Sequence, residues 1–239
     1  MTDTITGISS MATREVLNEM ARAYLRYNGT LARFESVGGV VAARRVESGE
    51  PFDVVVLASD AIDNLVAGGH VVSGSKADLV RSVVAVAVRA GMHQPDIGSE
   101  DELRRVVLAA RTIGYSTGPS GIELRKLFDR WGIADTVRDR IVQAPPGVPV
   151  GKLVAWGEVE LGFQQYSELM HIPGITVLGM MPSGCEIVTT FSAGICATST
   201  QAEAARALLS YLCSPVVAEI KRRYGMEPAI SYALQETHQ

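Results

Sequence analysis

The sequence contains few cysteines and lacks any long hydrophobic run. Among its 239 residues are three cysteines, Cys185, Cys196 and Cys213, an odd number without close pairing. This pattern argues against a disulfide framework and against a cysteine-ligated zinc cluster, and it is typical of free thiols in a reducing compartment. No apolar run approaches the length that spans a bilayer, so we expect no membrane insertion.

Basic and aromatic residues are also scarce. The chain has 22 Lys and Arg against 26 Asp and Glu, a net charge of -4, and 6% aromatic residues. Nucleic-acid binding requires a basic surface, so we expect no nucleic-acid partner. The four histidines, at positions 70, 93, 171 and 238, lack the spacing of metal ligands. Phosphate-binding-loop and serine-hydrolase motifs are absent as well, so we predict neither a metal nor a cofactor.

Residues 1–8 lack both the basic segment and the hydrophobic segment of a signal peptide. If Met1 is native, this absence predicts a cytoplasmic protein. If Met1 was added during cloning, a periplasmic location stays open.

Hydrophobic runs typical of strands alternate with amphipathic segments typical of helices along the whole chain. Residues 52–58 form a nearly continuous apolar run of the kind that is buried on both faces of a parallel sheet. Such alternation predicts an α/β fold with mainly parallel sheets. In open α/β sheets, ligands bind beyond the carboxyl ends of the strands.

Hydroxyl residues follow three of the predicted strands. Ser9 and Ser10 follow residues 4–8, Ser59 follows residues 52–58, and Ser116, Ser120 and Gly121 lie in the turn after residues 111–115. Each turn leads into a predicted helix, whose first N–H groups and dipole favour an anion. The alternative interpretation is an ordinary serine helix cap. Repetition at three strand ends favours a pocket for a small anion with several oxygen atoms.

Four segments together resemble the type II solute-binding proteins, especially their molybdate-binding branch. The segments are Gly7–Ser10, Gly49–Val56, Ser116–Gly121 and Gly157–Gln164. The resemblance implies two α/β lobes joined by two crossing strands, with a ligand cleft between the lobes. It places lobe one at residues 1–82 and 193–239, lobe two at residues 83–192, and the crossing strands at residues 81–88 and 187–197.

The resemblance also implies which residues bind the ligand. Its motifs carry the anion contacts to Ser9 or Ser10, to Ser59 and to the turn from Ser116 to Gly121. One departure concerns residues 162–168, Gly-Phe-Gln-Gln-Tyr-Ser-Glu, which replace the tyrosine-and-hydroxyl pattern of the molybdate receptors. This difference weighs against molybdate as the ligand.

The turn at residues 115–121 is also similar to that of the aconitate isomerases, which shift a double bond in an unsaturated tricarboxylate. An allylic shift needs a base that removes a proton from one carbon and returns it to another. Glu168 and Tyr115 are the candidate proton-transfer groups if the chain is such an enzyme. A purely structural role is the alternative for both.

Two further side chains are candidates for ligand contacts. Arg81, at the start of a predicted crossing strand, has the planar geometry that clamps a carboxylate, although an ordinary salt bridge is equally compatible with its position. Gln164 and Gln165 alternate along a strand, so only one can face the ligand, and we assign Gln164. Arg44 and Arg45 lie on a predicted helix, where a solvated position is the simpler interpretation.

Three classes of function stay open. The first is a cytoplasmic isomerase of an unsaturated polycarboxylate such as aconitate. The second is a molybdate- or oxyanion-binding component of an ABC transporter, and the third is a ligand-sensing module. Fold alone does not choose between them, and homo-oligomerisation also stays open.

Overall fold

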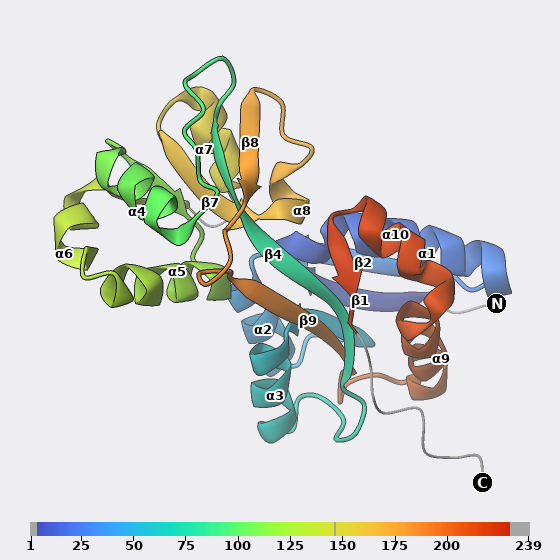
Figure 1. The fold of residues 1–239 in the computed structure, drawn as a ribbon. Coiled ribbons are helices and arrows are strands. Elements are labelled where there is room, and N and C mark those ends of the chain that lie inside the picture. The colour runs from blue at the N-terminus through green and yellow to red at the C-terminus, as the bar shows by residue number, and fades with distance from the viewer. Residues whose placement is uncertain (1–3, 146, 230–239) are drawn as a thin grey trace, which may run out of the picture. The chain divides into compact units, whose positions relative to one another are not determined.

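The computed structural model describes residues 4–145 and 147–229 and divides the chain into two compact units. Unit 1 contains the described residues of Met1–Arg81 and Thr190–Gln239, and unit 2 contains Ser82–Thr189. Both boundaries fall inside strands, β4 (Ala77–Arg89) and β9 (Val188–Ile195), so each of these strands contributes residues to both units (Figure 1).

Unit 1 is built on a sheet with three parallel strands. The strands are β1 (Ile5–Ser10), β2 (Ala32–Val37) and β3 (Val54–Ala58). β1 lies between β2 and β3 and is parallel to both, while β9 runs antiparallel to β3. β10 (Met226–Pro228) pairs with β4.

Helices pack on both faces of β3, which explains its uninterrupted apolar sequence. Val54 and Val56 belong to the hydrophobic cluster that includes α1 and α9, whereas Val55 and Leu57 belong to the cluster with α2 and α3. A strand buried on both faces cannot alternate polar and apolar residues. The helices of unit 1 are η1 (Met11–Thr13), α1 (Arg14–Asn28), α2 (Gly39–Glu47), α3 (Ser59–Ala67), α9 (Ala202–Cys213), η3 (Pro215–Val217) and α10 (Ala218–Arg223).

The sheet of unit 2 mixes parallel and antiparallel pairs. Its strands beside β4 are β5 (Ile113–Tyr115), β6 (Ile141–Gln143), β7 (Leu161–Gln165) and β8 (Ile175–Met180). β5 is parallel to β6 and β7, whereas β7 and β8 run antiparallel to β4. The helices are α4 (Glu100–Ala109), α5 (Pro119–Arg130), α6 (Ala134–Val137), η2 (Arg138–Arg140), α7 (Val150–Trp156) and α8 (Tyr166–Leu169).

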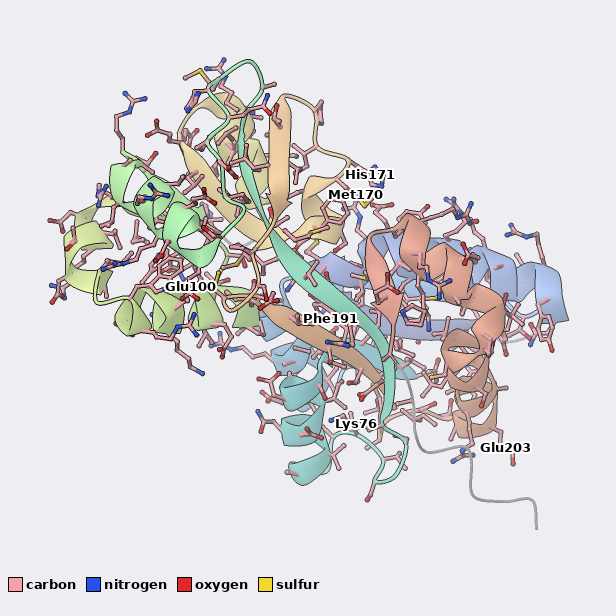
Figure 2. All side chains as sticks on the ribbon, viewed as in Figure 1. Lys76, Glu100, Met170, His171, Phe191 and Glu203 are labelled. Carbon is pink, nitrogen blue, oxygen red and sulfur yellow. The ribbon has the colours of Figure 1, made fainter. Side chains whose placement is uncertain are left out.

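Polar contacts join the helices of unit 2 at their ends. Glu100, labelled in Figure 2 at the start of α4, accepts hydrogen bonds from Arg130 Nη2 at 2.7 Å and from Trp131 Nε1 at 2.6 Å. These bonds fix the first turn of α4 against the end of α5.

Among the residues that the structure describes, none of the helices has the length and apolar character needed to cross a membrane.

Candidate functional site

The carboxyl ends of the parallel strands in unit 1 lie at one edge of the sheet. The chain leaves β1 for β2 on one side and later returns to β3 on the other side, so this edge is a topological switch point. Ligands of open α/β sheets bind at such points. Helices α2 and α3 begin at this edge, and α1 follows β1 through the short helix η1.

The start of α2 is open to an anion. It follows Gly38, has no side-chain cap and carries no acidic residue in its first turn. A Cβ atom added at Gly39 would lie 4.0 Å from Ser10 Oγ, which places the Ser10 hydroxyl beside the first turn of the helix. Ser10 Oγ accepts a bond from Ala12 N at 3.4 Å, and its own proton stays available as a donor.

Two other predicted serines at this edge differ in whether their hydroxyl groups have hydrogen-bond partners. Ser59 is the first residue of α3, and its hydroxyl has no hydrogen-bond partner within the described ranges. Ser9 is fully buried, with its Oγ 2.7 Å from Ser36 Oγ on the neighbouring strand. We therefore define the hydroxyl edge of unit 1 as Ser10, Gly38, Gly39 and Ser59, with Ser9 beneath it as a link between strands.

The acid in the first turn of α3 makes that helix a weaker anion site than α2. Asp60 is exposed and directly follows Ser59. Its charge opposes the field of the helix N-terminus, although solvent screens an exposed group. An anion is therefore favoured most strongly near Gly39 and Ser10.

The turn between β5 and α5 supplies a similar opening in unit 2. α5 follows Gly118 without a side-chain cap and has no acidic residue in its first turn. Ser116 Oγ and Ser120 Oγ lie 3.5 Å apart. A Cβ atom at Gly121 would lie 2.0 Å from Ser116 O, so only glycine allows the helix to approach the strand end this closely.

Gln164 and Glu168 form a hydrogen-bonded pair in unit 2. Gln164 is 2% exposed; its Oε1 accepts from Gly151 N at 3.1 Å and its Nε2 donates to Glu168 Oε1 at 3.0 Å. Burial raises the pKa of Glu168 to about 7, against the opposing effect of the Gln164 bond. The adjacent Gln165 instead donates to Thr189 Oγ1 at 2.8 Å.

Tyr115 lies in a different environment from Glu168. It is 6% exposed and belongs to the hydrophobic core of unit 2. Its side chain also lines a surface pocket of about 530 Å³ beside α5 and α6, and Glu168 is absent from that lining. Tyr115 therefore lines this pocket without Glu168, the other predicted proton-transfer residue.

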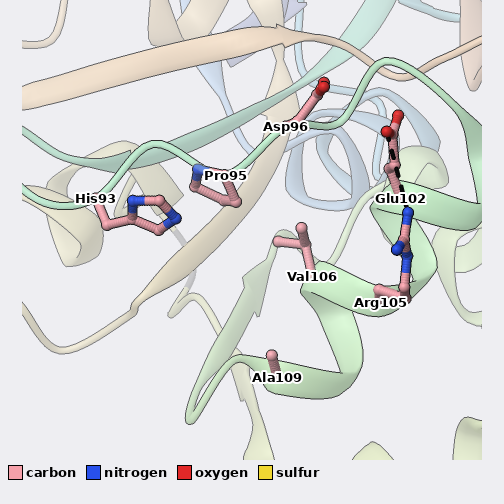
Figure 3. A pocket seen from close by; sticks show the side chains of 7 residues that line it. All are labelled: His93, Pro95, Asp96, Glu102, Arg105, Val106 and Ala109. Atoms are coloured by element: carbon pink, nitrogen blue, oxygen red, sulfur yellow. Dashed lines mark ion pairs between the residues drawn. The ribbon is translucent and has the colours of Figure 1, made fainter.

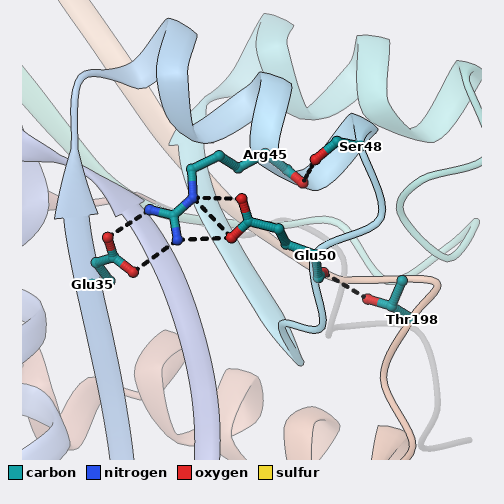
Figure 4. A network of polar contacts seen from close by, with 5 residues as sticks. All are labelled: Glu35, Arg45, Ser48, Glu50 and Thr198. Carbon is teal, nitrogen blue, oxygen red and sulfur yellow. Dashed lines mark hydrogen bonds and ion pairs between the residues drawn. The ribbon is translucent and has the colours of Figure 1, made fainter.

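The arginines considered from the sequence also differ. Arg81 is exposed, and its guanidinium makes no ion pair or hydrogen bond within the described residues. Arg45 is held between two carboxylates of unit 1, with Nη1 2.5 Å from Glu35 Oε1 and Nη2 2.7 Å from Glu50 Oε2 (Figure 4). The Arg45 bond lowers the pKa of Glu35. Arg45 thus joins β2 to the turn after α2, while Arg81 stays free.

Another surface pocket of unit 2 contains none of the predicted site residues. It measures about 440 Å³ and lies between α4 and the preceding loop, with His93 on one wall and the Glu102–Arg105 pair, 4.0 Å apart, on another (Figure 3). Across the described ranges, no three His, Cys, Asp or Glu residues are grouped as metal ligands.

Comparison with known proteins establishes the family. Residues 5–227 match the family model of bacterial extracellular solute-binding proteins. The chain belongs to this family. An aconitate isomerase from a Pseudomonas species is 37% identical to it over 231 residues, which cover 94% of this chain and 88% of that protein. The resemblance to solute-binding proteins inferred from the sequence is thereby confirmed.

Solved structures confirm the predicted fold of this family member. The periplasmic molybdate-binding protein of Azotobacter vinelandii has a TM-score of 0.78 at 18% identity, over 95% of this chain and 99% of that one. The sulfate-binding protein SubI of Mycobacterium tuberculosis H37Rv has a TM-score of 0.76 at 16% identity, over 95% and 87%. At such identities the likeness concerns the fold alone.

Sequence reasoning missed the role of Gly38 and Gly39 in the hydroxyl edge and the link from Gln164 to Gly151. A glycine at the N-cap has no side chain to bond the first N–H groups, so this helix start is left open. The second link joins residues 13 positions apart and has no local sequence signature.

Proposed function

We propose that the protein binds a small carboxylate anion and isomerises an unsaturated polycarboxylate of the aconitate type. The observation that carries the binding part is that α2 and α5 both begin without a side-chain cap or a first-turn acid, each beside a serine hydroxyl. The open N–H groups at the start of α2, the dipoles of both helices and the neighbouring hydroxyl donors suit a carboxylate; at the start of α5, Pro119 has no N–H group and Gly121 N donates to Gly118 O at 3.0 Å. The aconitate isomerase relative favours an unsaturated tricarboxylate.

The chemical part of the proposal assigns proton transfer to Glu168. The Glu168 carboxylate removes a proton from one carbon, the electron pairs move so that the double bond shifts by one position, and the carboxyl group returns the proton to the far carbon. The reaction is redox-neutral and needs no co-reactant. A carboxyl group with a pKa of about 7 is suited to act as both base and acid at neutral pH.

Ligand-induced stabilisation tests the proposal. Purified protein is melted alone and with cis-aconitate, trans-aconitate, citrate, sulfate, molybdate and tungstate, because a ligand that binds the native state raises Tm. We expect the aconitates to raise Tm, and proton NMR in heavy water then follows their interconversion and deuterium uptake. Stabilisation by molybdate or tungstate alone would contradict the isomerase role.

An oxyanion receptor for a transporter is the second candidate, and the likeness to molybdate- and sulfate-binding folds favours it. Arg81→Ala separates the two candidates. A carboxylate clamp requires that Arg81→Ala weaken carboxylate binding far more than molybdate binding. Cell fractionation adds a further check on the predicted cytoplasmic location, because a transporter's receptor meets its ligand outside the cytoplasm.

A further inference from the structure

Gln164 is buried between the first turn of α7 and the carboxyl group of Glu168, at the end of β7. We propose that Gln164 is a positioning residue, which turns Glu168 so that a single carboxyl oxygen, Oε2, exchanges the proton. The inference rests on the proposed function. It replaces a direct ligand contact by Gln164 with an action through Glu168.

The orientation of the Gln164 amide follows from its partner on α7. A backbone N–H group can only donate a hydrogen bond, so the atom 3.1 Å from Gly151 N must be the amide oxygen. The amide nitrogen then faces Glu168 Oε1 at 3.0 Å. An exchange of oxygen and nitrogen would place two donors together at Gly151, which excludes the flipped amide.

The orientation of Gln164 decides where Glu168 carries its proton. An amide N–H occupies Oε1 and can only donate, so Oε1 must act as an acceptor in both charge states. When Glu168 is protonated, the proton therefore resides on Oε2. Gln164 thus presents one oxygen atom for proton transfer and keeps the other engaged.

Tight packing around Gly151 holds the donor for Gln164 in place. A Cβ atom at Gly151 would lie 2.7 Å from Ile172 Cδ1 and 2.9 Å from Leu169 Cδ2. Glycine therefore lets α7 approach α8 and the loop after it. Glu168 directly precedes Leu169 on α8. The packing of Gly151 against Leu169 therefore fixes both partners of Gln164, the Gly151 N–H group and the Glu168 carboxyl group.

Three other ionisable side chains lie on the elements of unit 2 that flank Glu168. On the neighbouring helices and the following loop they are Lys152, which is exposed, Tyr166 and His171. The causes of the raised pKa of Glu168 are burial and, in the opposite direction, the Gln164 bond. The Gln164 bond is therefore the polar contact whose removal should be visible in a titration.

The test is a titration of Glu168 that needs no substrate. The carboxyl carbon is followed by ¹³C NMR from pH 4 to pH 10 in the wild-type protein and in Gln164→Met, and it is assigned by its loss in Glu168→Gln. Removal of the N–H donor should raise the Glu168 pKa by up to about one unit. If the methionine variant does not fold, Gln164→Glu takes its place in the titration, because its carboxylate retains an acceptor for Gly151 N. A second negative charge beside Glu168 should raise the Glu168 pKa further.

Gln165→Met is the matched control, because Gln165 bonds Thr189 and makes no bond to Glu168. Its Glu168 pKa should equal that of the wild type. An unchanged pKa in Gln164→Met, or an equal shift in the control, would overturn the positioning role. Failure of the isomerase assay would leave this titration unaffected, so the two hypotheses fail separately.

With aconitate as the probe, Gln164→Met should lower kcat about tenfold or more while KM changes little, and the pH optimum should follow the shifted pKa. A loss confined to KM would instead indicate direct ligand contact and overturn the positioning role.

Discussion

The two units differ in how they treat the first N–H groups of the helices near their strand ends. In unit 1, α2 and α3 begin without side-chain caps beside Ser10 and Ser59. In unit 2, α5 also begins without a side-chain cap, but the first turn of α7 donates to Gln164, which also holds Glu168. An uncapped helix start can serve a ligand, whereas a capped one stabilises the protein itself.

The difference suggests a division of labour. The hydroxyl edge of unit 1 contains neutral donors and no buried titratable group, which suits anion binding across a broad pH range. Unit 2 holds one carboxyl group with a pKa of about 7, which suits proton transfer near neutrality. Substitutions in unit 1 should therefore affect anion binding alone, and substitutions at the carboxyl group of unit 2 should affect proton transfer alone.

The largest effect should come from Glu168→Gln, which preserves shape but removes the exchangeable carboxyl proton. General acid–base catalysis contributes about 100- to 10,000-fold to a rate, so kcat for aconitate isomerisation should decrease by a factor in that range. Ligand-induced stabilisation should persist. An NMR time course and a melting curve with trans-aconitate measure the two quantities, and a fully active variant would remove Glu168 from the reaction.

The pH dependence of stability should reveal the same carboxyl group. Its pKa is about 7 in the folded protein against 4.5 in the unfolded chain. Between these values the unfolded chain binds fewer protons, so the free energy of unfolding falls as pH rises towards and through 7. The loss is up to about 3 kcal/mol, an upper limit because Glu168 as a whole residue is only half-buried, although its carboxyl group is buried.

Urea denaturation at pH 5 and pH 8 measures this dependence in the wild-type protein and in Glu168→Gln. The variant should lack most of the decrease, since its amide does not titrate. Identical pH dependence in both proteins would show that Glu168 ionises normally in the folded state.

Local sequence patterns predicted the elements well wherever adjacent residues decide the structure. Ser99 and Glu102 have the spacing of a capping box, a serine three residues before a glutamate, and in the structure Ser99 Oγ accepts from Glu102 N at 3.3 Å. Residues 136–142 give no clear pattern, because they contain the end of α6, a 3₁₀ turn and the start of β6. Short elements give too little periodicity to be distinguished.

Contacts between distant residues could not be predicted in this way. Asp53 accepts bonds from Thr6, Ser199 and Gln201, and the buried Lys221 Nζ donates to Leu79 O at 2.9 Å. Such partners become neighbours only through the fold, so spacing in the sequence carries no sign of them. The serine turns were predictable because strand, turn and helix are consecutive in the sequence. Which of the serine hydroxyls has a hydrogen-bond partner was not predictable.

Two glycine substitutions compare the close packing within unit 2 with the open backbone at the hydroxyl edge of unit 1. Gly121→Ala should lower the free energy of unfolding by about 1–3 kcal/mol, because its Cβ would lie 2.0 Å from a backbone oxygen that cannot swing away. Gly39→Ala should be tolerated, since its nearest contact would be 3.9 Å from Leu57 Cδ2. Urea denaturation measures both, and equal destabilisation would contradict the difference in packing.

The smallest effect should come from Ser59→Ala in the hydroxyl edge. One hydrogen bond to a charged group contributes about 1.5 kcal/mol, so the Kd for the anion should rise about tenfold. Stability should hardly change, because the Ser59 hydroxyl bonds no other described residue. Ser48→Ala is the control, since Ser48 Oγ donates to Arg45 O at 2.8 Å at the far end of α2. Calorimetric titration measures both affinities, and equal values for the two variants would assign anion binding to groups other than Ser59.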